Sequence, residues 1–218
     1  MNSLLRIPLH TSASQTERLH RLQHAFAEVC NALAPLVQQT ACWNRVALHH
    51  MAYKPLRQRF PGLGSQMVCN AIYSVSRTCR LVYQHRESPF NLQRLNGKAL
   101  PRLLFIPQSP VYFDRHTLSL KDGQVSMFTL DGRMRFSLDL TPDNEARFRN
   151  EKLREIVLSS KAGAFTLSFL FAEGDADDEA SPEQVTGGDL PEYVLITDDA
   201  PIQQAWQLPG PQRTALHP

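Results

Sequence analysis

The spacing of apolar residues changes near Pro101, and this change constrains the fold more than any other feature of the chain. Before it, apolar side chains recur at steps of three and four residues, as on one face of an amphipathic helix. After it, short runs of alternating apolar and polar residues predict strands. An apolar segment at residues 4–9 predicts one strand ahead of the helices. The sequence therefore predicts an α+β fold, with helices inserted between a first strand and a series of antiparallel strands.

Three helices are predicted before Pro101. The first starts at a capping box formed by Ser14 and Glu17, and Pro35 is expected to kink or end it. Its buried stripe consists of Leu19, Leu22, Phe26, Val29, Leu33 and Leu36. The second covers residues 43–60 and ends at a Pro-Gly-Leu-Gly break. The third starts at Ser65 as N-cap, and its buried stripe consists of Val68, Ile72, Val75, Cys79 and Val82.

The strands after Pro101 are predicted to pair in antiparallel order. Asp-Gly dipeptides at residues 122–123 and 131–132 stand between alternating segments, which is a strong hairpin signal. The order predicts an antiparallel β-barrel from residues 1–12 and 101–172, with a three-helix lobe at residues 13–100 inserted into it. The predicted strands are residues 103–106, 111–113, 116–120, 124–130, 133–138, 156–159, 165–171 and 193–197.

The charge of the chain is divided unevenly along its length. Residues 1–162 contain 22 of the 23 Lys and Arg but 11 of the 21 Asp and Glu, a net charge of +11. Residues 163–218 contain one Arg and ten acidic residues, a net charge of −9. The basic segment predicts a polyanion as partner, although solvated arginines that only confer solubility are the alternative. Residues 173–218 are predicted to be an acidic, largely disordered tail, either a plain linker or a segment that folds back on the basic surface.

Basic and aromatic residues alternate through the predicted helical lobe, which favours phosphate neutralisation combined with stacking on unpaired bases. Trp43, Phe60 and Tyr83 are expected to belong to the core, whereas Tyr73 lies one step off the buried stripe. The candidate nucleic-acid-binding residues from this pattern are Arg45, Lys54, Arg57, Arg59, Tyr73, Arg77, Arg80, Arg86, Lys98 and Arg102.

No catalytic residue, metal site or cofactor site is predicted. The sequence lacks a nucleophile elbow, a P-loop, a dinucleotide fingerprint and an H-E-x-x-H motif, so we do not expect an enzyme. The four cysteines form no C-x-x-C pair and are expected to be reduced, with Cys30, Cys69 and Cys79 packed among apolar residues. His20 and His24 are spaced for one helix face but lack further ligands. Without a signal peptide or a membrane-spanning run, the chain is expected in the cytoplasm.

Two segments resemble a known family. In VYFDRHTLSLKDGQVSMFTLDGRMRF, residues 113–115 are similar to an aromatic-Asp-x-Arg element, one residue short, and residues 129–133 to a Thr-Leu-x-Gly-Arg hairpin. PLRQRFPGLGSQMVCNAIYSVSRTCR resembles the helical-lobe segment of the same family. Together, across about residues 4–172, they resemble the non-nuclease front half of TnpB-type RNA-guided nucleases, relatives of type V CRISPR effectors.

The resemblance implies a wedge-type, OB-like barrel with an inserted recognition lobe. In the family, this half grips a guide RNA and reads a short duplex motif beside the target. The resemblance places Ser65, Gln66, Cys69 and Asn70 at that motif, where Ser, Gln and Asn side chains can hydrogen-bond base edges. In TnpB a RuvC-like nuclease domain follows, and the 46 residues after Ala172 are too few for one.

The sequence therefore predicts a nuclease-lacking TnpB-like protein that binds structured guide-type RNA and the double-stranded target DNA that this RNA specifies. One alternative is the recognition subunit of a two-chain nuclease, with the RuvC domain on a partner. A second is an RNA-independent regulator that binds duplex DNA, and a third is a protein-interaction module with an acidic protein partner.

Overall fold

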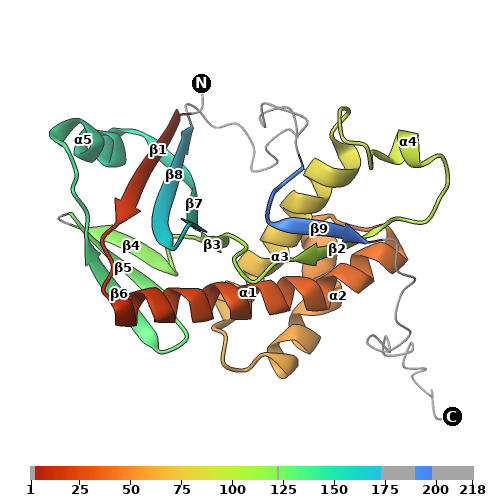
Figure 1. The fold of residues 1–218 in the computed structure, drawn as a ribbon, viewed down its shortest axis with the longest axis horizontal. Coiled ribbons are helices and arrows are strands. Elements are labelled where there is room, and N and C mark those ends of the chain that lie inside the picture. Colours follow the sequence, from red (N-terminus) through yellow and green to blue (C-terminus); the bar gives the residue numbers. More distant parts are fainter. Residues whose placement is uncertain (1–2, 122, 173–189, 198–218) are drawn as a thin grey trace, which may run out of the picture.

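A computed structural model describes residues 3–121, 123–172 and 190–197. In these residues the chain forms a mixed α+β fold of five helices and three antiparallel sheets (Figure 1). The helix-rich front and strand-rich back predicted from the sequence are confirmed. None of the helices in these ranges is long and apolar enough to cross a membrane.

Helix α1 (Ala13–Thr40) runs the length of the molecule and joins its two ends (Figure 1). All six residues of its predicted stripe are buried. The predicted capping box is wrong by two residues, because the Ser12 hydroxyl accepts from the Gln15 amide and the Gln15 side chain accepts from the Ser12 N–H. Of the two outcomes expected at Pro35, an end of the helix is not observed, because α1 continues to Thr40. The neighbours of Pro35, Ala34 and Leu36, are buried and hold this part of the helix against the core.

The other helices lie near the predicted positions. They are α2 (Arg45–Arg59), α3 (Ser65–Cys79) with its π-helical extension η1 (Arg80–Gln84), and the short α4 (Leu92–Leu95). Gly64 rather than Ser65 is the N-cap of α3, and no side chain caps that end. The predicted apolar stripe from Val68 to Val82 is buried throughout.

Helix α5 (Pro142–Asn150) was not predicted, because it is short and none of its residues is fully buried. Its start carries a recognisable signal, since the Thr141 hydroxyl accepts from the Asn144 amide and Pro142 occupies the first turn. Phe148 attaches the helix to the sheet by edge contacts with Phe169 and Phe171.

The strands form three separate antiparallel sheets. Sheet A has the order β1-β8-β7-β3, sheet B pairs β2 with β9, and sheet C has the order β4-β5-β6. The pairs Lys121–Gln124 and Thr129–Gly132 confirm the two predicted hairpins, and Gly123 and Gly132 both have positive φ. The bounds are β1 (Ser3–Leu9), β2 (Arg102–Phe105), β3 (Val111–Phe113), β4 (Leu118–Lys121), β5 (Gln124–Thr129), β6 (Gly132–Ser137), β7 (Lys152–Lys161), β8 (Ala164–Ala172) and β9 (Val194–Thr197).

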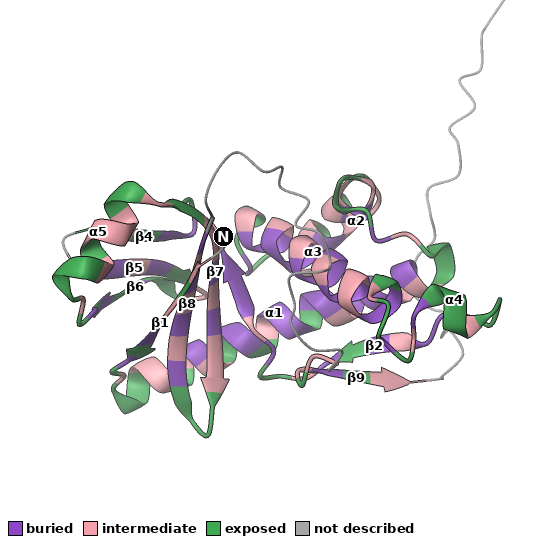
Figure 2. Ribbon diagram, turned by 90° about the horizontal axis from the view of Figure 1, so that it is seen from above, coloured by how far each residue is buried: buried purple, intermediate pink, exposed green. Residues whose placement is uncertain are grey.

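The predicted β-barrel is not closed in the described residues, so this part of the prediction is corrected. Strand β3 has three residues and pairs only with β7, and the turn after it leads the chain into sheet C without a shared hydrogen-bonded ladder. The sheets instead contribute apolar faces to one continuous core, which also includes the buried face of α1 (Figure 2). The apolar face of a sheet must be covered, either by closing the sheet into a barrel or by packing it on other elements. Here the sheets pack on one another and on α1, so their apolar faces are buried without closure.

Candidate nucleic-acid interface

Helices α2 and α3 carry two facing stripes of polar, basic and aromatic residues. On α2, Arg45, His49, Tyr53 and Arg57 recur every four residues and therefore lie along one side of the helix. On α3, Gln66, Cys69 and Tyr73 do the same at steps of three and four. We call these seven residues the α2–α3 face. Neither helix contains an Asp or Glu.

Tyr73 and Arg45 connect the two stripes. The Arg45 guanidinium lies 5.3 Å from the centre of the Tyr73 ring, and the Tyr73 ring meets Tyr112 edge-on at 5.6 Å. The Tyr73 hydroxyl donates to Glu155 Oε2 at 2.7 Å. Arg45 therefore covers part of the Tyr73 ring that the sequence suggested for base stacking. Arg45 is itself exposed, and a guanidinium can stack on a base or pair with a phosphate.

Farther along α2, His49 and Tyr53 stack on each other at 4.7 Å with an interplanar angle of 18°. Arg57 donates to the Leu63 carbonyl and so joins α2 to the turn before α3. Sequence reasoning did not select His49 or Tyr53 as binding residues, although the four-residue spacing from Arg45 to Arg57 was visible in the sequence.

The turn between β3 and β4 supports the start of α3. Asp114 Oδ1 accepts from the amides of His116 and Thr117, while Asp114 Oδ2 accepts from Gln66 Nε2 at 2.6 Å. Asn70 is buried and its amide nitrogen donates to Thr117 Oγ1 at 3.3 Å. Of the residues that the resemblance places at a duplex motif, Asn70 therefore faces the protein. Ser65 is exposed, whereas Gln66 and Cys69 are half-buried.

Cys69 lies within reach of the charges of Arg45, Arg57 and Asp114. Burial raises the pKa of the Cys69 thiol, the positive charge of Arg45 opposes this rise, and Asp114 adds to it. The thiol is therefore a neutral, weakly polar group at neutral pH. The prediction of buried thiols is confirmed for Cys30 and Cys79 and is wrong for Cys69, which is half-buried beside charged residues.

Arg77 belongs to a different environment from Arg45. Its Nε lies 3.5 Å from Glu155 Oε2, and its side chain is only 26% exposed. Burial, followed by the Glu155 carboxylate, raises the pKa of the Tyr73 phenol that shares this carboxylate. Glu155 comes from β7, so this cluster fastens α3 to sheet A and leaves Arg77 less available to a phosphate.

The remaining predicted residues are spread around the helical end. Lys54, Arg59, Arg86 and Lys98 are exposed, and Arg80 and Arg102 are half-buried. Arg59 lies over the Phe60 ring at 5.4 Å. Trp43 and Tyr83 are buried as predicted, with ring centres 5.4 Å apart, whereas Phe60 is half-buried. The α2–α3 face thus gathers Arg45, Arg57, Gln66 and Tyr73 from the predicted set.

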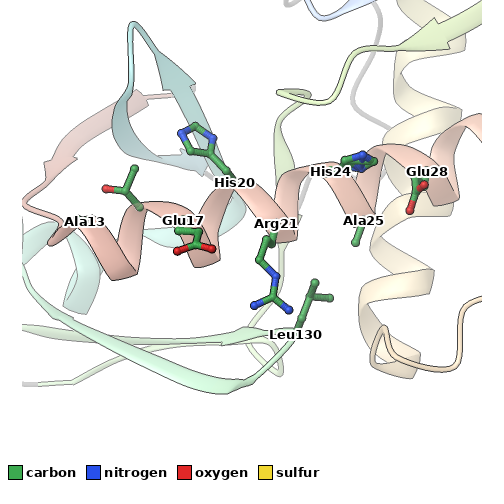
Figure 3. Close-up of a pocket in the computed structure, with 9 residues that line it drawn as sticks. Ala13, Glu17, His20, Arg21, His24, Ala25, Glu28 and Leu130 are labelled. Atoms are coloured by element: carbon green, nitrogen blue, oxygen red, sulfur yellow. The ribbon is translucent and has the colours of Figure 1, made fainter.

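Apart from the α2–α3 face, a pocket follows α1 beside the β5–β6 hairpin (Figure 3). His20 points toward sheet A, and its ring lies 4.8 Å from that of Phe165, while Arg21 points toward Leu130. His24 lies one turn farther along α1. Among the described residues, no group of three or more His, Cys, Asp or Glu is placed to hold a metal ion.

Comparison with protein-family models gives no match for this chain, and comparison with curated proteins gives none either.

Proposed function

We propose that this protein binds structured, guide-type RNA through the α2–α3 face and, together with that RNA, binds the double-stranded DNA that the RNA specifies. We propose no catalytic step for it. The proposal extends the resemblance to the front half of TnpB-type nucleases, in which a helical lobe and a strand-rich part share this task.

The observation that carries the proposal is the uncompensated positive charge of the α2–α3 face. No Asp or Glu occurs between Glu28 and Glu87, whereas seven Lys and Arg do. The two carboxylates that approach the face from the sheet side are already engaged, Asp114 by Gln66 and Glu155 by Tyr73 and Arg77. Arg45 and Arg57 therefore remain as charges that a phosphate backbone would neutralise.

RNA suits this face better than a long duplex does. A recognition helix that enters a major groove needs a broad exposed side with base-reading groups. Helix α3 is buried against α1, α2 and β3, and Asn70 is turned inward. A narrow row of guanidinium, imidazole and phenol groups matches phosphates beside unpaired bases, which structured RNA offers in its loops.

The test compares two variants of the full chain, each with two fewer positive charges. Arg45→Gln with Arg57→Gln alters the α2–α3 face and retains amide donors. Arg6→Gln with Lys161→Gln, both exposed on sheet A, is the matched control. The protein is produced with its native flanking DNA, its ratio of absorbance at 260 and 280 nm is recorded, and any RNA is sequenced.

We expect the unaltered chain and the control to carry a discrete RNA, and the Arg45/Arg57 variant to lose it. With that RNA as probe, the slope of log affinity against log salt should fall by roughly 0.7–0.9 for each lost phosphate contact. A folded Arg45/Arg57 variant with unchanged RNA affinity and unchanged salt slope would show that the α2–α3 face does not bind the RNA. Protein free of RNA that binds short DNA duplexes would favour the duplex-binding regulator instead.

A further inference from the structure

The outer face of sheet C is a second surface of unusual composition. Side chains alternate along its strands, so Val125, Met127 and Met134 point into the core. The opposite face presents Ser119, Lys121, Gln124, Ser126, Phe128, Arg133 and Arg135, which we call the sheet C face. It combines three positive charges with polar groups and one large aromatic ring, and none of its residues is among the predicted binding residues.

Phe128 and Arg133 form a fixed pair on this face. They lie opposite each other on β5 and β6, and the Arg133 guanidinium is 4.1 Å from the Phe128 ring centre. Arg133 Nη1 donates to the Ser126 carbonyl at 3.1 Å and Nη2 to the His116 carbonyl at 3.3 Å. Phe128 is nevertheless 40% exposed. The face thus displays an aromatic ring and a guanidinium that are already ordered, which lowers the entropic cost of binding.

Beside this pair, the sheet C face is hollowed. A hollow of about 430 Å³ is lined by Ser119, Lys121, Gln124, Ser126 and Arg135, together with Val125. Within the described ranges, no carboxylate forms an ion pair with Lys121, Arg133 or Arg135. Asp131 at the hairpin end is taken by Arg18 and Arg21 of α1, at 3.7 and 3.0 Å. The hollow therefore offers hydroxyl, amide and cationic groups to an anion.

We propose that the sheet C face binds a single-stranded stretch of nucleic acid, with a base stacked at Phe128 and the backbone following Arg135 and Lys121. An exposed ring among basic residues on a sheet binds unpaired bases, because only these offer a free ring face. Equivalent rows of the face repeat about every 6.8 Å, so three rows cover about 14 Å of an extended strand. A duplex has its bases stacked inside the helix, so its phosphates could contact the basic side chains but no base could stack on Phe128.

This inference deepens the proposed function by giving it a second contact surface of distinct chemistry. The two surfaces are linked through the β3–β4 turn, where the His116 carbonyl accepts from Arg133 and Asp114 accepts from Gln66. One RNA could therefore contact the α2–α3 face with a structured part and the sheet C face with an unpaired part.

The test measures fluorescence anisotropy of labelled probes with the full chain. The probes are an oligouridylate of about 12 nucleotides and a DNA duplex of similar charge. Phe128→Ala with Arg135→Gln should weaken oligouridylate binding about tenfold or more, because base stacking and one phosphate contact are lost. The Arg6→Gln with Lys161→Gln control should change it less than about threefold. Phe128→Trp should retain binding, and its added fluorescence should be quenched by the oligouridylate.

The outcomes separate this inference from the proposed function. Loss of oligouridylate binding in the Phe128/Arg135 variant, with the Arg45/Arg57 variant unaffected, supports the sheet C face by itself. Unchanged oligouridylate binding in a folded Phe128/Arg135 variant overturns it, even if the α2–α3 face binds RNA as proposed. An equal loss of duplex and oligouridylate binding, or no quenching in Phe128→Trp, also overturns it, because the face would then be a phosphate-only surface.

Discussion

At the scale of single residues, partners rather than residue type decide what each arginine can do. Arg45 and Arg77 lie on neighbouring helices close to Tyr73: Arg45 lies over its ring, and Arg77 shares the Glu155 carboxylate with its hydroxyl. Arg45 is exposed and over a ring, whereas Arg77 is paired with a carboxylate whose side chain is only 10% exposed. The first is available to a ligand, and the second stabilises the junction between α3 and sheet A.

Substitution of Glu155 tests this distinction. Glu155→Ala removes the acceptor of the Tyr73 hydroxyl and leaves the Arg77 charge poorly compensated. We expect the free energy of unfolding to fall by about 2–3 kcal/mol, toward the lower end for a broken buried pair, because Arg77 is partly exposed. Urea unfolding measures this loss. The control, Glu145→Ala, breaks an exposed pair with Arg149 on α5 and should cost less than about 0.5 kcal/mol. Equal losses in the two variants would contradict the assigned role.

At the scale of elements, α1 is attached to sheet B by a side chain that imitates a strand. Asn31 Nδ2 donates to the Phe105 carbonyl at 2.9 Å, and Asn31 Oδ1 accepts from the Phe105 amide at 2.7 Å. Gln38 Nε2 donates to the Leu100 carbonyl at 3.0 Å in the same way. The Asn31 bonds satisfy the N–H and the carbonyl of Phe105 in β2, and the Gln38 bond satisfies the Leu100 carbonyl ahead of β2. Together they hold α1 against this part of the chain on both sides of Pro35.

Asn31→Leu should therefore destabilise the protein despite adding an apolar group. It leaves the N–H and the carbonyl of Phe105 without partners, and each unsatisfied group costs about 1–3 kcal/mol. Asn31→Asp retains an acceptor for the Phe105 amide and should lose less. Thermal unfolding of both variants, with hydrogen exchange at the Phe105 amide, tests whether Asn31→Leu is the more destabilised of the two. A more stable Asn31→Leu would show that packing on α1 outweighs the pairing.

At the scale of the whole molecule, the core encloses groups that ionise in alkaline solution. Burial raises the pKa of the thiols of Cys30 and Cys79 and of the phenols of Tyr83 and Tyr112. In the unfolded chain these groups lose protons above about pH 8.5 for Cys and about pH 10 for Tyr. The folded state then binds more protons than the unfolded state. The contribution of these groups to the free energy of unfolding is therefore fully present below about pH 8 and is lost as pH rises.

We expect the free energy of unfolding, measured in reducing buffer, to decline from about pH 8.5 upward, by at most about 1.4 kcal/mol per pH unit for each ionising thiol. Cys30→Ala with Cys79→Ala should flatten the decline between about pH 8.5 and 10, whatever its effect on absolute stability. An unchanged slope would mean that the thiols reach water in the folded state.

Most of the elements could be predicted because their causes are local. The stripe from Leu19 to Leu36 fixes the buried side of a helix, and the Asp131-Gly132 dipeptide marks a hairpin. The errors at the helix starts are small shifts, to Ser12 from Ser14 and to Gly64 from Ser65. The larger error concerns neighbours in space, because the strands form three sheets rather than a closed barrel. The predicted 173–189 part of the acidic tail and residues 198–218 lie outside the described residues.

The candidate site shows the same division. The sequence alone determined the charge asymmetry of the chain, the absence of carboxylates from α2 and α3, and the four-residue rhythm of Arg45 and Arg57. Only the tertiary structure decided that Asn70 turns inward to Thr117, that Arg77 meets Glu155, and that the outward residues of sheet C share one face. Helix and strand periods are short-range properties of the chain. Which charge remains free depends on partners such as Glu155, which follows Arg77 by 78 positions and reaches it only through strand pairing.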